Sequence, residues 1–122
     1  MLSELETFYT QQPEPIKSCF LFLKDFIVRQ GENITQEWKY KLPFFYLNNK
    51  PFCYLWKEKQ TQTPYIGIVD GDKLSHPKLV QGNRKKIKIL YLIGINPNKD
   101  INVQLLTEIF EEMIKFRTSQ SK

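Results

Sequence analysis

Residues 38–56 read WKYKLPFFYLNNKPFCYLW and hold eight of the chain's seventeen aromatic residues. Residues 44–47 in this stretch, and residues 51–57 at its end, are mostly apolar and rich in types that favour strands, and Asn48-Asn49-Lys50 separates them. Asparagine readily adopts the left-handed conformations of tight turns, so the stretch predicts a β-hairpin. Both sides of its second strand are apolar as far as Leu55, which predicts a central strand covered on both faces.

Two helices are predicted before this hairpin. Residues 2–9 place apolar side chains at helical spacing, and the prolines in residues 11–15 end that segment, because proline disfavours a helical residue before it. The next segment is a stronger amphipathic helix, with apolar residues at i, i+3 and i+4. Those residues are Ile16, Cys19, Phe20, Leu23, Phe26 and Ile27. Gly31 follows at the position expected for a C-terminal glycine cap.

After the hairpin, the sequence predicts two more strands and a helix. Residues 65–69 form a strand closed by the turn at residues 70–72, and residues 87–93 form another. Gly67, alone within its strand, is expected to let a ring or another backbone approach closely. A last helix is expected to begin between residues 98 and 102. Its apolar stripe is Val103, Leu106, Ile109, Phe110, Met113 and Ile114.

This order of elements predicts an α+β fold. An antiparallel sheet of about four to five strands is expected to pack against the N-terminal helices and the C-terminal helix. A chain of 122 residues fits a single domain over residues 1–122, with residues 118–122 as a flexible tail. The content of 41% hydrophobic and 25% charged residues is ordinary for a globular protein.

The chain is expected to be cytoplasmic. Its N-terminus is acidic and lacks the apolar segment of a signal peptide, and its longest apolar run, residues 89–95, is too short to span a bilayer. Cys19 and Cys53 fit neither a disulfide framework nor a zinc site, so both are expected to be buried, reduced thiols that lie apart from each other.

The net charge of +5 is concentrated in one part of the chain. Residues 61–99 carry seven basic and two acidic side chains, and residues 84–88, with the sequence RKKIK, supply most of the excess. Such a cluster can bind phosphates or an acidic partner. It can also be a solvated turn and strand edge, where lysines prevent pairing with other strands. The sequence leaves both interpretations open.

No catalytic or metal-binding motif is found in the sequence, so neither enzyme activity nor a cofactor is predicted. His76 is the only histidine, which excludes a metal site with two imidazoles from one chain. As a loop histidine it can bind a ligand or relay a proton, or simply bond to nearby backbone. Cys53 has no histidine near it in the sequence, and Asp70-Gly71-Asp72 lacks the later ligands of a calcium loop.

The aromatic residues suggest a binding site. Phenol and indole groups seek hydrogen-bond partners and tend to lie where a core meets water. We therefore expect several of these rings to border a cleft, with one histidine and one arginine as further ligand-binding candidates. The candidates are Trp38, Tyr40, Tyr46, Trp56, Tyr65, His76 and Arg84. The alternative is that the rings are ordinary core and rim residues.

Three features resemble the YdhG-like domain family, a group of small bacterial α+β domains of largely unknown function. They are the paired helices leading to residues 38–45, the aromatic hairpin followed by residues 65–68, and the segment from Asp72 to Pro77 with residues 82–85. The resemblance covers residues 5–117 and implies the same fold. Some members are described as frataxin-like iron chaperones, which implies iron binding by exposed carboxylates. The candidates are Asp70, Asp72, Glu108, Glu111 and Glu112, although the chain is basic overall.

Three functions are therefore considered. The first is a non-enzymatic binding or chaperone-type module with an aromatic-lined cleft for a small ligand or a protein partner. The second is a frataxin-like iron-binding protein. The third is a nucleic-acid or acidic-partner binder that acts through the cluster Arg84–Lys88, because rings on a strand can stack bases while basic residues hold phosphates. The chain is expected to be a monomer or a weak homodimer and not to bind membranes.

Overall fold

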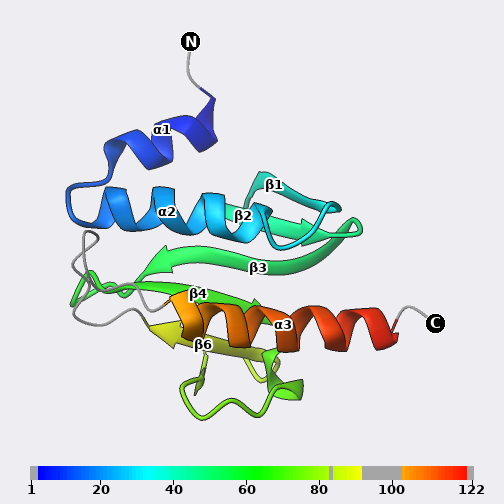
Figure 1. Ribbon diagram of the computed structural model, residues 1–122. Helices are drawn as coiled ribbons and strands as arrows, with labels where there is room; N and C mark the ends of the chain where they lie inside the picture. The colour runs from blue at the N-terminus through cyan, green and yellow to red at the C-terminus, as the bar shows by residue number, and fades with distance from the viewer. Residues whose placement is uncertain (1–2, 83, 92–102, 121–122) are drawn as a thin grey trace.

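The protein has an α+β fold in a computed structural model that describes residues 3–82, 84–91 and 103–120. Three helices accompany a six-stranded antiparallel sheet with the strand order β1-β2-β3-β4-β6-β5 (Figure 1). The predicted fold class is confirmed, with slightly more strands than expected. The helices are α1 (Glu4–Gln11), α2 (Ile16–Val28) and α3 (Val103–Gln120), with a short 3-10 turn, η1 (Gly71–Lys73). The strands are β1 (Ile34–Lys39), β2 (Leu42–Leu47), β3 (Lys50–Lys57), β4 (Pro64–Val69), β5 (Val80–Gln81) and β6 (Ile87–Tyr91).

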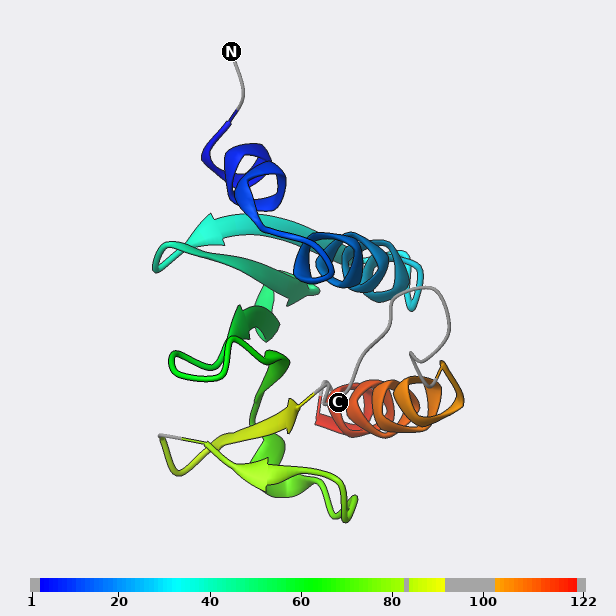
Figure 2. The same ribbon diagram turned by 90° about the vertical axis from the view of Figure 1, so that its left-hand side faces the viewer.

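The two longer helices, α2 and α3, lie on the same side of the sheet (Figure 2). The short helix α1 packs beside α2 and next to β1, with Phe8 contacting Phe20 and Trp38. No described helix covers the opposite side of the sheet, which we call the open face. None of the described helices is both long and apolar enough to cross a membrane.

The core fills the space between the sheet and the helices. The side chains expected from the helical periodicities to face the sheet are buried, namely Phe20, Leu23, Ile27, Leu106, Ile109 and Phe110. The Phe110 ring contacts Phe26 of α2 and Phe52 of β3, so it joins both helices to the sheet. A cavity at this position would cost roughly 3–5 kcal/mol, because the ring is surrounded on all sides.

The ends of the N-terminal helices follow from local chemistry. Ser3 caps α1 in a reciprocal arrangement with Glu6, and the helix ends at Gln11 ahead of Pro13, as expected. The prediction that Gly31 caps the C-terminus of α2 is wrong. The helix ends at Val28, its capping residue Arg29 keeps a right-handed conformation, and Gly31 does not adopt a left-handed φ.

The β2–β3 hairpin forms as predicted. Its turn residues Asn48 and Asn49 have φ angles of 53° and 66°, the left-handed values that asparagine tolerates. A register shift leaves Phe52 as an extra residue on β3, between the pairs Phe45–Cys53 and Tyr46–Pro51. Phe52 and its neighbour Cys53 are both almost completely buried.

Two strands are absent from the sequence-based prediction. The sequence predicts no strand over residues 34–39, although Ile34, Gln36 and Trp38 alternate with exposed residues along β1. Strand β5 has only two residues. The fourth predicted strand is β6, of which residues 92–93 lie outside the described residues, as does the expected helix start at residues 98–102. Helix α3 continues to Gln120, into the segment 118–122 that was expected to be a tail.

Candidate functional site

A row of aromatic rings crosses the open face of the sheet. Tyr40 contacts Phe44 at 5.8 Å between ring centroids, and Phe44 contacts Tyr54 at 5.2 Å. From Tyr54 the row continues to Tyr65 at 6.4 Å and then to Tyr91 at 5.4 Å. Tyr46 joins it through Phe44 at 6.0 Å. We call this set, Tyr40, Phe44, Tyr46, Tyr54, Tyr65 and Tyr91, the tyrosine ladder.

The strand register brings these rings together. Phe44 and Tyr54 are directly opposite each other on β2 and β3, and Tyr65 and Tyr91 are opposite on β4 and β6. Opposite side chains in an antiparallel sheet lie close enough for rings to touch. Tyr54 is opposite Gly67, whose missing side chain leaves room for the tyrosine ring, so the expected close approach at this glycine is confirmed.

The ladder is separate from the core beneath the helices. None of its rings belongs to that core cluster, which lies on the other side of the sheet. Phe44 and Tyr46 are buried, whereas Tyr54, Tyr65 and Tyr91 are half-buried and Tyr40 is 76% exposed. The ladder therefore has a packed base and several tyrosines that remain accessible to a ligand.

Basic side chains lie at two places on the ladder. The Lys39 ammonium lies 5.7 Å from the Tyr40 ring centroid and 5.8 Å from that of Tyr46. Its interaction with the Tyr46 hydroxyl raises the pKa of Lys39, which keeps the amine charged. Burial raises the pKa of Tyr54, and the positive charge of Arg84 acts on it in the opposite direction. The charge of Arg84 is therefore within electrostatic range of Tyr54.

The phenol groups of Tyr54 and Tyr65 stay protonated at neutral pH. Burial raises the pKa of Tyr65 to about 12, and the neighbouring Tyr54 and Tyr91 add to the effect. Neutral phenols can both donate and accept hydrogen bonds. The ladder thus offers ring faces for stacking and hydroxyl groups for polar contacts.

The structure places the rings that were expected to share one cleft in two groups. Tyr40, Tyr46 and Tyr65 lie together on the ladder, whereas Trp56, although opposite Tyr65 in the pairing of β3 with β4, stacks on Phe8 of α1 at 5.8 Å. Trp38 also contacts Phe8, and its Nε1 donates a hydrogen bond to Glu4. Both tryptophans therefore contact α1.

Trp38 lines a separate surface hollow. This hollow has a volume of about 280 Å³ and is otherwise lined by residues of α1. Those residues are Glu4, Thr7, Phe8 and Gln11. It includes none of the ladder rings, so a ligand at Trp38 would occupy a different site from one on the tyrosine ladder.

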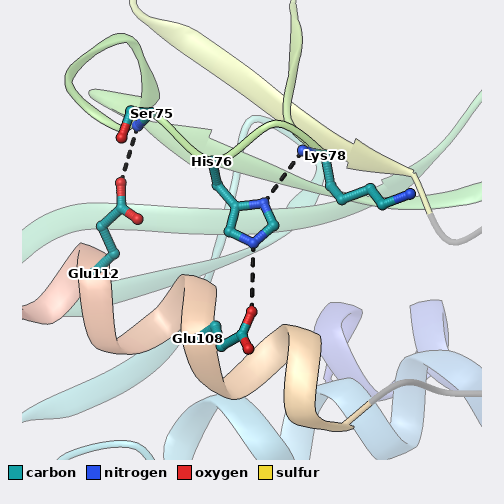
Figure 3. Close-up of polar contacts among 5 residues, drawn as sticks. All are labelled: Ser75, His76, Lys78, Glu108 and Glu112. Carbon is teal, nitrogen blue, oxygen red and sulfur yellow. Dashed lines mark hydrogen bonds and ion pairs between the residues drawn. The ribbon is translucent and has the colours of Figure 1, made fainter.

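His76 fastens a loop to α3. Its Nδ1 accepts a hydrogen bond from the backbone N–H of Lys78 at 3.2 Å, and its Nε2 lies 3.5 Å from a carboxylate oxygen of Glu108 (Figure 3). One turn further along α3, Glu112 accepts a hydrogen bond from the backbone N–H of Ser75 at 2.9 Å. These contacts give His76 a structural role in holding the loop, in line with its interpretation as a histidine bonded to nearby backbone.

Four of the five carboxylates considered for iron binding have other partners. Glu108 and Glu112 point to different groups of the loop, and Asp70 pairs with Arg117 at 3.7 Å. Asp72 lies 3.8 Å from the Lys73 ammonium. Within residues 3–82, 84–91 and 103–120, no three histidine, cysteine or acidic side chains are grouped so that they could hold a metal ion.

Both cysteines are free and buried, as expected. Burial raises the pKa of Cys19 to about 12, and burial also raises the pKa of Cys53. A thiol must ionise to act as a nucleophile or metal ligand. Neither cysteine has the environment of a reactive group.

The comparisons with known proteins found no matching family model, no similar curated protein and no similar solved structure. The resemblance to the YdhG-like family therefore stays a prediction, and the site is interpreted from its own geometry.

Sequence reasoning missed three members of the site: Phe44, Tyr54 and Tyr91. Phe44 lies two positions before Tyr46 on the same strand, so strand periodicity could have placed these two on a shared face, and Tyr54 joins them because it is opposite Phe44. Tyr91 could not be found in this way, because its place beside Tyr65 depends on the pairing of β4 with β6.

Proposed function

We propose that the protein is a non-enzymatic binding module and that the tyrosine ladder is its binding surface. The observation that carries this proposal is the continuous row of contacting rings on a sheet face that no described helix covers. The ligands that fit such a surface contain flat, unsaturated rings, which stack on tyrosine faces.

The residue type favours binding over a purely structural role. Tyrosine supplies a large, rigid contact area with little side-chain entropy to lose, and it is enriched in binding surfaces. An exposed apolar patch on a globular protein often marks an interaction site. Tyr40 supports this view, because its ring is mostly exposed yet still contacts Phe44.

The other two candidate functions receive different support. Iron handling lacks a cluster of ligands in the described part of the chain. Binding of an acidic partner is compatible with the ladder, since Lys39 and Arg84 lie next to it. The buried free thiols suit a reducing compartment, and we propose a cytoplasmic location on that basis.

A titration followed by amide chemical shifts tests the binding surface. Adenosine monophosphate and indole serve as flat aromatic probes, and ribose 5-phosphate serves as the matched probe without an aromatic base. The aromatic probes should shift the amides of Tyr54, Tyr65 and Tyr91, whereas ribose 5-phosphate should leave them in place. Shifts centred on α1 or α3, or no shifts with either aromatic probe, would contradict the proposed site.

A further inference from the structure

We infer that the ligand of the tyrosine ladder is single-stranded nucleic acid, with bases stacked on the tyrosine rings and phosphates held by Lys39 and Arg84. This inference rests on the proposed function and adds the chemical class of the ligand. It differs from binding by the 84–88 cluster alone, because it requires the rings as well as the charges.

The geometry of the ladder favours a polymer over one small ligand. The rings from Tyr40 to Tyr91 form a series that crosses β2, β3, β4 and β6, with neighbouring centroids 5.2–6.4 Å apart. A single flat molecule can cover one or two of these rings. A chain that repeats a flat group can use the whole series, as in other proteins that stack successive bases on aromatic side chains.

The charges beside the ladder favour an anionic polymer. Lys39 lies over two ladder rings, and Arg84 acts electrostatically on Tyr54. Arg84, Lys85 and Lys86 are exposed in the turn between β5 and β6. Two acids in the described part of the chain are near the ladder: Glu37, opposite Phe44, and Glu58, whose negative charge adds to the raised pKa of Tyr65. Lys39 and the three basic residues of the turn outnumber them. A neutral aromatic ligand would leave these cations without a role.

The ladder requires unpaired bases. In a duplex the faces of the bases are stacked on one another and cannot reach tyrosine rings, whereas a single strand can turn its bases outward. Ring stacking tolerates every base, so we expect little sequence preference. The 2′-hydroxyl can distinguish RNA from DNA, and both are used in the test below.

Fluorescence anisotropy with labelled single strands of about a dozen nucleotides tests this inference, since such strands match the site size of small single-strand-binding domains. Oligothymidine and oligouridine are the probes, and a duplex of equal length is the competitor. We expect single strands to bind more tightly than the duplex, with an affinity that falls as salt rises.

Two ladder variants and one control separate stacking from other effects. Tyr40→Asn removes an exposed ring, and asparagine tolerates the left-handed φ of 55° at this turn position, so the fold should be retained. Tyr65→Leu removes a ring from the middle of the ladder. Each should weaken single-strand binding roughly 5- to 150-fold. Phe22→Ala, which removes an exposed ring from α2, should leave binding unchanged.

The charge contribution has its own matched pair. The double variant Lys39→Gln/Arg84→Gln should lower affinity and reduce the slope of log affinity against log salt by about 1.4, because two phosphate contacts are lost. The control Arg29→Gln/Lys115→Gln removes one arginine and one lysine from exposed positions on the helix side. That control should keep the salt slope of the unchanged protein.

Several results would overturn the inference. Single-strand binding that is insensitive to both tyrosine changes would mean that the basic cluster acts alone. If no oligonucleotide bound but indole still shifted the ladder amides, nucleic acid would be excluded as the ligand and the proposed binding function would stand. If indole and adenosine monophosphate also failed to shift those amides, both the nucleic-acid inference and the proposed binding function would be wrong. If sedimentation showed a dimer and Tyr40→Asn dissociated it, the open face would instead be the interface with a second copy of the chain.

Discussion

The ring of Tyr54 lies directly over Gly67 on the neighbouring strand. A Cβ atom built on Gly67 would be 2.1 Å from Cζ of Tyr54 and 2.4 Å from Cε1, far closer than two carbons can approach. The glycine therefore makes room for the central ring of the tyrosine ladder, and no other residue type fits without moving that ring.

Gly67→Ala should destabilise the protein by about 1–3 kcal/mol, because the added methyl group overlaps the Tyr54 ring. Urea denaturation measures the change. Gly31→Ala is the matched control: its Cβ would meet Ile34 at an ordinary 3.5 Å, so stability should stay within about 1 kcal/mol of the original. Equal effects of the two changes would show that Tyr54 does not occupy this space.

Arg117 joins the end of α3 to the sheet. Its Nη2 donates to the carbonyl oxygen of Pro51 at 2.7 Å and lies 3.4 Å from that of Val69, and its guanidinium pairs with Asp70. Arg117→Met should lower stability by about 1–3 kcal/mol, since hydrogen bonds to a charged group are lost. Lys115→Met, at an exposed position on the same helix, should have little effect in the same denaturation experiment.

Stability should fall in strongly alkaline solution because of the ladder. The pKa of Tyr65 is about 12 in the folded protein, against an ordinary value of 10.0. Between these values the unfolded chain loses the proton and the folded chain keeps it, so stability decreases as pH rises from 10 to 12. Denaturation midpoints measured across this range should fall less for Tyr65→Phe, which cannot ionise. An identical fall would mean that Tyr65 does not contribute.

The two thiols should be protected in the folded protein. Cys19 and Cys53 are buried, and burial raises the pKa of each thiol, which suppresses the reactive thiolate. Alkylation by iodoacetamide, followed by mass spectrometry, should be slow without denaturant and should speed up in proportion to the unfolded fraction. Rapid modification of either cysteine under native conditions would contradict the packing described here.

Neutralising the basic turn should not affect folding. The triple change Arg84→Gln, Lys85→Gln, Lys86→Gln should alter stability by less than about 1 kcal/mol, because these side chains are exposed. The turn is held by other means: the side-chain amide of Gln81 donates to the carbonyl oxygens of Arg84 and Lys85 at 2.8 and 3.1 Å. Gln81→Ala should therefore be the more destabilising change when both proteins are unfolded by heat.

The helices and the central hairpin could be predicted because their signals are local. The spacing of Phe20, Leu23 and Ile27 follows the helical repeat, and Asn48-Asn49 marks the turn because asparagine tolerates the left-handed conformation found there. The buried residues of these elements were correspondingly found. Strand β1 was missed because its inward-facing positions include the polar residue Gln36. The hydrogen-bond partner of Gln36 is the hydroxyl of Tyr9 on α1, which is far away in the sequence.

The site was harder to predict because it depends on pairings between distant segments. Tyr65 contacts Tyr91 only when β4 and β6 pair, and the register of this pairing cannot be predicted from either segment alone. Trp56 was grouped with Tyr65 from sequence and is opposite it in the strand register, yet its ring stacks on Phe8, which only the position of α1 decides. The sequence thus identified many of the aromatic residues but not which rings each would contact.

Because the helices cover one side of the sheet, mutation can act on the two sides separately. On the proposed function, a change at Tyr40 or Tyr65 alters ligand binding, while Phe20 and Phe110 on the other side continue to hold the helices in place. The binding surface can therefore be redesigned without rebuilding the core that supports it.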